Sequence, residues 1–248
     1  NAGYTTACIG KWHLGLGWAL KDSQRPQILN PHRFDYTNTN FSAPVKGGPT
    51  ELGFDYSFVL PASLDMPPYV FVRNDEVVDP NVVLTADVYP HSKDSTVYAW
   101  DRKYTDEDDI YWERGVWWRN GEMSRSFKFE DCLPTIIREG ISFIDRASKS
   151  GQPFFLYMPL TGPHTPWLPE ERFQGTSQMG VYGDFIANID DAVAQVTRKL
   201  RELGLEENTI VIFSSDNGAA WEEEDVLRYA HQSNWGRRGE KGDAWDGG

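Results

Sequence analysis

Apolar and polar positions follow two kinds of pattern along this chain, and each kind predicts a different element. Apolar residues at helical spacing predict a helix over 134–148 and a longer one over 181–203, which Gly204 is placed to end. Unbroken apolar runs predict buried strands at 4–9, 153–158 and 209–214. Strand, helix and strand in this order indicate a parallel unit. We therefore predict a doubly wound, mostly parallel α/β sheet flanked by helices.

The stretches between these elements are less regular. Residues 16–53 are rich in Pro and Gly and read as loops, and a short hairpin is predicted with its turn near Asn74-Asp75. We treat 1–248 as part of one large domain, with 79–130 as a loop-rich aromatic insert. Tryptophans in that insert, Trp112 among them, have two interpretations: they stack on sugar rings, or they form a hydrophobic cluster that holds the insert in place.

Composition narrows the classes of partner. The 248 residues carry a formal net charge of −13 with a pI of about 4.8, which argues against nucleic acid as a partner. An anionic substrate would need a local cluster of positive charge. No apolar run approaches the ~20 residues that span a bilayer. The two cysteines form no disulfide framework, and Cys8, in an apolar strand, is expected to be a small buried hydrophobe.

The first strand leads into Lys11 and His13. We expect Gly10 to break the strand and the two side chains to alternate along an extended segment, so that both point the same way. A cation beside an imidazole can bind an anion. A lone K-x-H would more often be a surface lysine and a half-buried histidine.

Two later strands also end in polar groups. His164 follows the strand at 153–158, and Asp216-Asn217 follows the one at 209–214. Open α/β sheets gather ligand groups at the carboxyl ends of their strands, so these residues suggest one site. Asp216 and Asn217 offer oxygen ligands, which suit Ca²⁺ or Mg²⁺.

Four motifs in these places carry a family resemblance. The block Gly3-Tyr4-Thr5-Thr6-Ala7-Cys8-Ile9-Gly10-Lys11-Trp12-His13-Leu14-Gly15 resembles a signature segment of the type I sulfatases, in the alkaline phosphatase superfamily. Pro163-His164-Thr165-Pro166, Ser215-Asp216-Asn217-Gly218 and the run Arg238 to Gly248 resemble three further sulfatase segments, in family order. The resemblance covers essentially the whole chain and implies an alkaline phosphatase-like fold.

The resemblance also implies roles. Lys11 and His13 would touch the catalytic formylglycine and the sulfate, His164 would protonate the departing ester oxygen, and Lys241 would contact the sulfate. Asp216 and Asn217 would be two ligands of the divalent cation. By this resemblance a hydrated formylglycine attacks sulfur while cations neutralise the sulfuryl oxygens.

The chain also departs from the family pattern. No C/S-x-P-x-R nucleophile motif is present, and neither is the acidic pair that completes the metal site. Cys132-Leu133-Pro134-Thr135-Ile136 lacks the Arg and opens a helix, so Cys132 is interpreted as structural. We therefore expect an internal fragment, incomplete at both ends, that alone is inactive and binds Ca²⁺ weakly. The formylglycine is expected in the missing N-terminal segment.

The parent protein is thus expected to hydrolyse a sulfate ester, with a sulfated carbohydrate or other sulfated small molecule as substrate. Further candidate substrate contacts are His231, Asn234, Arg238 and Trp112. Two alternatives stay open: a phosphate or phosphonate ester hydrolase of the same superfamily, and an inactive relative that binds sulfated glycans. The family implies an exported protein, secreted, periplasmic or lysosomal. Nothing in the sequence indicates an oligomeric state.

Overall fold

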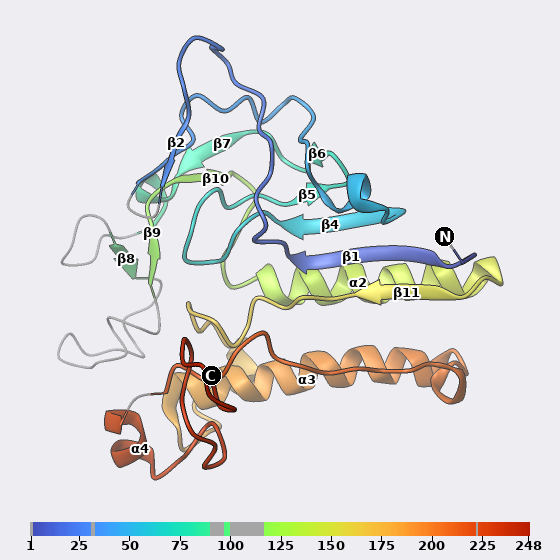
Figure 1. The fold of residues 1–248 in the computed structure, drawn as a ribbon, viewed down its shortest axis with the longest axis vertical. Coiled ribbons are helices and arrows are strands. Elements are labelled where there is room, and N and C mark those ends of the chain that lie inside the picture. Colours follow the sequence, from blue (N-terminus) through green and yellow to red (C-terminus); the bar gives the residue numbers. More distant parts are fainter. Residues whose placement is uncertain (1, 31–32, 90–96, 100–116, 222) are drawn as a thin grey trace. The chain divides into compact units, whose positions relative to one another are not determined.

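A computed structural model describes residues 2–30, 33–89, 97–99, 117–221 and 223–248 (Figure 1). The chain divides into two compact units, residues 1–204 and 205–248, and each is described by itself. Among the described residues, no helix combines the length and the apolar character that crossing a bilayer requires. The expectation of one domain with an insert at 79–130 stays a prediction.

The first unit is built on a five-stranded sheet in the order β11-β1-β4-β5-β6. Its strands are β1 (Thr5–Lys11), β4 (Tyr56–Leu60), β5 (Val72–Arg73), β6 (Glu76–Val77) and β11 (Phe154–Tyr157). Strand β1 lies between β11 and β4 and is parallel to both, whereas β5 and β6 are antiparallel (Figure 1). The predicted α/β architecture is confirmed, as a mixed sheet with helices packed on it.

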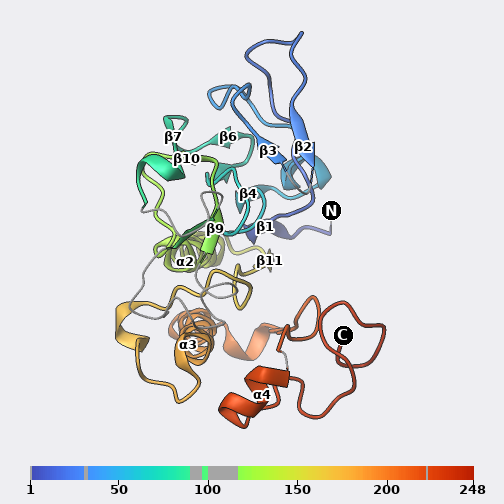
Figure 2. The same cartoon turned by 90° about the vertical axis from the view of Figure 1, so that its left-hand side faces the viewer.

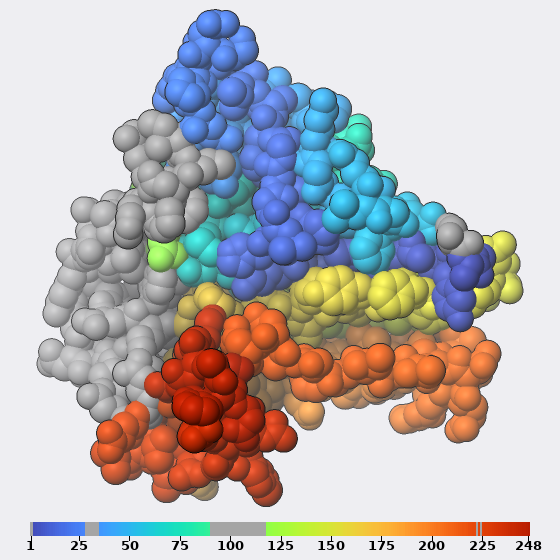
Figure 3. Space-filling model, in the orientation of Figure 1, coloured from blue at the N-terminus to red at the C-terminus, as the bar shows by residue number. Residues whose placement is uncertain are grey.

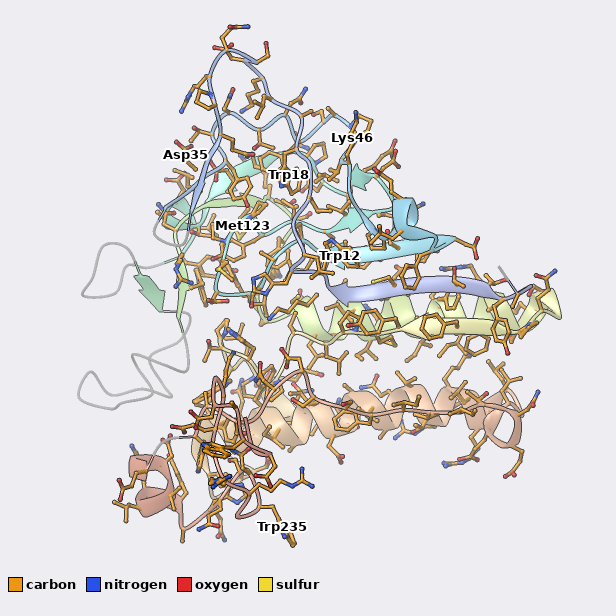
Figure 4. All side chains as sticks on the ribbon, viewed as in Figure 1. Trp12, Trp18, Asp35, Lys46, Met123 and Trp235 are labelled. Atoms are coloured by element: carbon orange, nitrogen blue, oxygen red, sulfur yellow. The ribbon has the colours of Figure 1, made fainter. Side chains whose placement is uncertain are left out.

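Strand β1 is buried on both faces, which explains its continuous apolar run. Ala7 and Ile9 belong to the core between the sheet and helix α2 (Cys132–Ser150). Cys8 and Trp12 belong to a second cluster, formed with the loop-rich segment that follows β1. Figure 4 shows Trp12 just beyond the end of β1, and Figure 3 shows the following segment (blue) at the surface. Fully burying one such aliphatic side chain contributes roughly 2–3 kcal/mol.

Two helices lie on the side of Ile9. Helix α2 packs on β1 and β11, and helix α3 (Gly180–Glu202) packs on α2 (Figure 2). Both confirm the helices predicted at 134–148 and 181–203. Gly151 ends α2 at φ 71°, and Gly204 follows α3 at φ 67°, a left-handed conformation that glycine adopts without strain.

The predicted hairpin is confirmed. Val72 pairs with Val77 and Arg73 with Glu76 across a turn in which Asn74 has φ 56°. Three further antiparallel pairs complete the first unit: β2 (Ile28–Asn30) with β3 (Arg33–Asp35), β7 (Val82–Leu84) with β10 (Glu122–Ser124), and β8 (Val97–Ala99) with β9 (Trp117–Arg119). Short 3₁₀ turns lie at Pro49–Leu52, Thr85–Asp87 and Glu171–Phe173.

The aromatic insert contributes to the core where it is described. Trp118 is fully buried, and its ring stacks on Phe129 at 4.0 Å between centroids. The interpretation as a packing cluster is therefore confirmed for Trp118. Trp112, the candidate for sugar stacking, lies outside the described residues, so its role stays a prediction.

The second unit contains one 3₁₀ turn (Glu206–Asn208), one helix, α4 (Glu223–Tyr229), and loops held by local hydrogen bonds. The strand predicted at 209–214 is wrong for this structure. Ile210 is 89% exposed and Phe213 is 73% exposed, and the segment belongs to no sheet. An apolar run alone does not make a strand. A strand also needs a neighbouring strand with which to form backbone hydrogen bonds.

Candidate active site

The carboxyl ends of the three parallel strands are tied together by backbone hydrogen bonds. The Lys11 amide donates to the Pro159 carbonyl at 2.7 Å, just beyond β11. The next two amides, of Trp12 and His13, donate to Leu60 and Pro61 at 2.9 and 3.0 Å, where β4 ends. The backbone of Lys11 and His13 is therefore fixed between the ends of β4 and β11. The segments that follow these two strands carry the other polar groups at this edge of the sheet.

His13 does not lie in an extended segment, as the sequence suggested. Strand β1 ends at Lys11, and His13 has φ 53°, in the left-handed region that non-glycine residues rarely adopt. Its side chain is exposed, whereas Trp12 between the two is buried. The backbone bond from His13 to Pro61 helps hold this conformation, and such conformations are often found at functional sites.

Gly10 does not break the strand, which is a second correction. It lies within β1 with φ 140°, and a Cβ atom at this position would sit 2.0 Å from the Pro159 carbonyl oxygen. The absence of a side chain lets the chain beyond β11 approach β1 closely enough for the Lys11 bond to form. Glycine is therefore required by contact as well as by conformation.

His164 reaches the same edge from β11. Its Nδ1 lies 2.8 Å from the Thr165 carbonyl oxygen and 3.9 Å from a carboxylate oxygen of Asp65, in the loop after β4. Lys11 and His13 therefore follow the end of β1 and His164 follows the end of β11, its parallel neighbour. Their assignment to one site stays a prediction.

Three buried polar side chains at this edge were missed by sequence reasoning. Ser63, Asp65 and Thr161 are 1%, 6% and 3% exposed, and each has a side-chain oxygen with no hydrogen-bond partner among the described residues. Ser63 and Asp65 follow β4, and Thr161 follows β11. The rule that ligand groups gather at strand ends, applied to β4 as well, would have found the first two.

Asp65 is held from its outer side by the insert. The Arg119 guanidinium donates to a carboxylate oxygen of Asp65 at 2.8 Å, and the Tyr69 hydroxyl donates to the Arg119 carbonyl at 2.8 Å. Tyr69 is completely buried, and loss of hydration raises its pKa well above the ordinary value, with the Asp65 charge adding to the effect. The Tyr69 hydroxyl therefore stays protonated and keeps donating.

The two cysteines have no place in this chemistry. Cys8 and Cys132 are both fully buried free thiols, and burial raises the pKa of Cys8 to about 12 and raises that of Cys132 as well. Neither forms a thiolate near neutral pH. The interpretation of both as structural residues is confirmed.

In the second unit the predicted metal pair lies in a loop. Asp216 is exposed, and the side-chain amide of Asn217 donates to the Gly218 carbonyl at 2.8 Å. Their oxygens fit Ca²⁺ or Mg²⁺ in kind, but such ions take six or more oxygen ligands. Among the described residues, no group of three His, Cys, Asp or Glu side chains is placed to hold a metal. The role of the pair as metal ligands therefore stays a prediction.

Asn234 organises the loops around that pair. Its amide nitrogen donates to the Gly239 and Gly247 carbonyls at 2.8 and 3.0 Å, and its oxygen accepts from the Ala219 amide at 3.0 Å. The Lys241 backbone amide donates to the Ala219 carbonyl at 3.0 Å. We call this arrangement the Asn234 cradle. It brings the segment after Asn217 beside Lys241, and it uses both amide hydrogens of a residue predicted to contact substrate.

The two other predicted substrate contacts in this unit have structural partners. The Arg238 guanidinium lies 3.2 Å from the centroid of the Trp245 ring, and the His231 carbonyl accepts from the Trp221 indole at 2.9 Å. Substrate contacts by His231, Asn234 and Arg238 stay predictions, as do the roles of Lys241 and the metal pair.

Comparison with known proteins points to one family. A family model described as Sulfatase matches residues 1–248. The N-acetylgalactosamine-6-O-sulfatase of Bacteroides thetaiotaomicron is 34% identical over an alignment of 233 positions, which covers 88% of this chain and 41% of that protein. The N-acetylgalactosamine-6-sulfatase of Rattus norvegicus is 30% identical over 220 residues, 89% of this chain and 31% of that protein.

A solved structure from work on the metabolism of multiple glycosaminoglycans by Bacteroides thetaiotaomicron has a similar fold. It superposes with a TM-score of 0.69 at 30% identity, covering 99% of this chain and 50% of that one. The chain therefore spans half or less of the length of these relatives.

Proposed function

Because the chain belongs to the sulfatase family, we propose that it carries part of the active site of an enzyme that hydrolyses sulfate monoesters of carbohydrates. The observation that supports the proposal is that Lys11 and His13, and likewise His164, follow the carboxyl ends of β1 and β11, two strands that pair in parallel. A cation and two imidazoles there can bind an anionic ester and move protons to and from its oxygens.

Each residue has a distinct part in this proposal. Lys11 neutralises charge on the sulfuryl oxygens, which grows as the ester bond breaks. The family resemblance assigns the same task to Lys241. His164 gives a proton to the departing sugar oxygen, which would otherwise leave as a poor, strongly basic alkoxide. His13 is assigned a second proton transfer, to and from the oxygen that enters from water.

Two groups that the family uses would come from beyond these residues. Formylglycine supplies the attacking oxygen, and Ca²⁺ or Mg²⁺ supplies positive charge beside the sulfate. Asp216 and Asn217 would contribute two of the oxygen ligands of the metal. Neither group alters the tasks assigned to Lys11 and His164, which are to bind the sulfate and to hold a proton.

The proposed substrate is a sulfated amino sugar. Support comes from the relatives named as N-acetylgalactosamine-6-sulfatases. Trp118 is buried and its ring stacks on Phe129, which gives no support to sugar stacking by that residue. By the same family relationship we propose that the protein is exported.

The test measures sulfate release by the complete gene product that contains this chain. We expect turnover of 6-sulfated N-acetylgalactosamine and little turnover of the matching 6-phosphate. Lys11→Ala and His164→Ala are each expected to lower kcat/KM by roughly 10²-fold or more. Lys46→Ala removes an exposed lysine from the same unit and is the matched control.

Other outcomes would select the alternatives. Faster turnover of the phosphate would favour a phosphate or phosphonate ester hydrolase. Binding of the sulfated sugar without turnover, together with a residue upstream of Asn1 that cannot become formylglycine, would favour an inactive glycan-binding relative. Reading the codons upstream of Asn1 for C/S-x-P-x-R is therefore the cheapest first step.

A further inference from the structure

One carboxylate at the strand ends is buried, charged and only half paired. Asp65 is 6% exposed, and its Oδ2 accepts from the Arg119 guanidinium at 2.8 Å. Its Oδ1 is buried and has no hydrogen-bond partner among the described residues. His164, whose ring can become a cation, has its Nδ1 3.9 Å from that oxygen.

A purely structural role explains Oδ2 and leaves Oδ1 unexplained. Arg119 also donates to the Asp65 carbonyl, and its own amide donates there too, so the loop and β9 are already fastened together. A buried acceptor without a donor is costly, and proteins keep such groups where they serve another purpose. An oxygen directed toward an imidazole can serve one, because it favours the charged form of the ring.

The bonding of His164 is consistent with that purpose. Its Nδ1 donates to the Thr165 carbonyl at 2.8 Å, which fixes the ring and makes Nε2 the nitrogen that takes up the second proton. Once both nitrogens are protonated, the positive charge lies beside the Asp65 carboxylate. The Arg119 cation lies on the opposite side of that carboxylate, bonded to the other oxygen.

We propose that Asp65 is a positioning residue for His164: its free carboxylate oxygen stabilises the protonated ring that delivers a proton to the leaving oxygen. This rests on the proposed function only in taking His164 as the proton donor. In the step itself, the attacking oxygen of the proposed function would form a bond to sulfur while the bond between sulfur and the sugar oxygen breaks. The electron pair of the broken bond goes to the sugar oxygen, the Nε2 proton of His164 is transferred to that oxygen, and His164 is left neutral.

The test separates proton delivery from folding by varying the leaving group. Aryl sulfates release a weakly basic phenoxide that needs little protonation, whereas sugar sulfates release a strongly basic alkoxide. In the full-length enzyme, Asp65→Asn keeps the shape of the side chain and removes its charge. We expect kcat for a sugar sulfate to fall by roughly 10- to 100-fold, with a much smaller change for 4-nitrophenyl sulfate.

The control is Asp191→Asn. Asp191 is also a carboxylate clamped by an arginine, Arg172, but it lies on α3. It should leave the ratio of the two rates unchanged, and Asp65→Glu, which restores the charge, should return the ratio toward wild type. Equal losses on both substrates, or no loss on either, would overturn the proposal. If Asp65→Asn does not fold, Arg119→Gln, which removes the ion pair that holds Asp65, is tested in the same assay. It should lower kcat for the sugar sulfate more than kcat for 4-nitrophenyl sulfate.

A second readout does not depend on turnover. In protein labelled with ¹⁵N-histidine, the Nδ1 proton of His164 should resonate downfield in the wild type and move upfield in Asp65→Asn, with the other histidines unchanged. An unmoved His164 signal would overturn the pairing. If the wild-type enzyme cleaves no sulfate ester, the proposed function fails, while this measurement still decides whether Asp65 acts on His164.

Discussion

The two units position their polar residues by different means. At the edge of the first unit, Lys11, His13, Asp65 and His164, which we call the strand-end cluster, are placed by the register of parallel strands and by bonds between distant backbone segments. In the second unit, the Asn234 cradle does this with one side chain. A site on a sheet is rigid because many bonds share the task, and a site on a cradle depends on each of its few bonds.

The largest effect is expected from the tightest contact in the strand-end cluster. Gly10→Ala should destabilise the first unit by about 4 kcal/mol or more, because the new Cβ would overlap the Pro159 carbonyl and strain a φ of 140°. Gly151→Ala, at φ 71° in open space, should cost only about 1–2 kcal/mol. Urea unfolding curves measure both, and similar losses would mean that the close approach to Pro159 is not rigid.

The same substitution in each unit gives the next contrast. Ile9→Ala, at a fully buried position, should cost about 2–5 kcal/mol of unfolding free energy. Ile212→Ala, at a position 85% exposed, should cost less than about 0.5 kcal/mol. A large loss from Ile212→Ala in thermal or urea unfolding would restore the prediction of a buried strand at 209–214.

Loss of the cradle should loosen the second unit alone. Asn234→Ala removes three hydrogen bonds and should lower the local opening free energy around Lys241 by about 1–3 kcal/mol. Amide hydrogen exchange at Lys241 and Gly247 reports the change, with Asn208→Ala, at an exposed position, as the control. Faster exchange across β1 as well would contradict a purely local role for the cradle.

Lowering the pH is expected to have a smaller effect, a loss of unfolding free energy in the first unit. The Arg172 guanidinium bonded to Asp191 holds the pKa of that carboxyl below its ordinary value of 3.8. The ion pair therefore stabilises the folded state above that pH, and its contribution, below about 1 kcal/mol, is lost as the pH falls through the lowered pKa. Unfolding curves between pH 5 and 2 should show that Asp191→Asn loses less unfolding free energy on acidification than the wild type. An equal loss would mean that the ion pair does not contribute to the acid sensitivity.

Calcium is expected to have the smallest effect. Asp216 and Asn217 supply too few ligands, so calorimetric titration of residues 1–248 should give a dissociation constant weaker than about 1 mM. Asp216→Asn should then change little. Tight, stoichiometric binding would mean that described residues outside this pair complete a metal site.

Sequence reasoning succeeded where one local pattern decides the structure. The helical spacing of Ile137, Ile141 and Ile144 predicted α2, and the placement of Gly204 predicted the end of α3. Lys11 with His13, and His164, were each predicted to follow a strand because 4–9 and 153–158 are apolar runs, and β1 and β11 do pair in parallel. Their common site was implied by the family resemblance.

The misses have a common physical cause, which is that they depend on partners distant in sequence. The role of Gly10 is set by Pro159, and the burial of Asp65 is set by Arg119 and His164. The run at 209–214 has strand composition, but composition does not supply a neighbour to pair with. The cradle around Asn234 has no periodicity at all, because its bonds go to loop carbonyls.

The contact between Tyr89 and Trp118 has a consequence for protein engineering. These rings meet edge to face at 5.0 Å, and both also pack on Phe129. The three rings therefore fix the described residues Tyr89 and Trp118 to the same part of the core, so that the length of the connection between them can be varied by design. Because each doubling of loop length costs only ~0.6 kcal/mol in closure entropy, inserts of different length can be grafted there while β1, β4 and β11 keep their register.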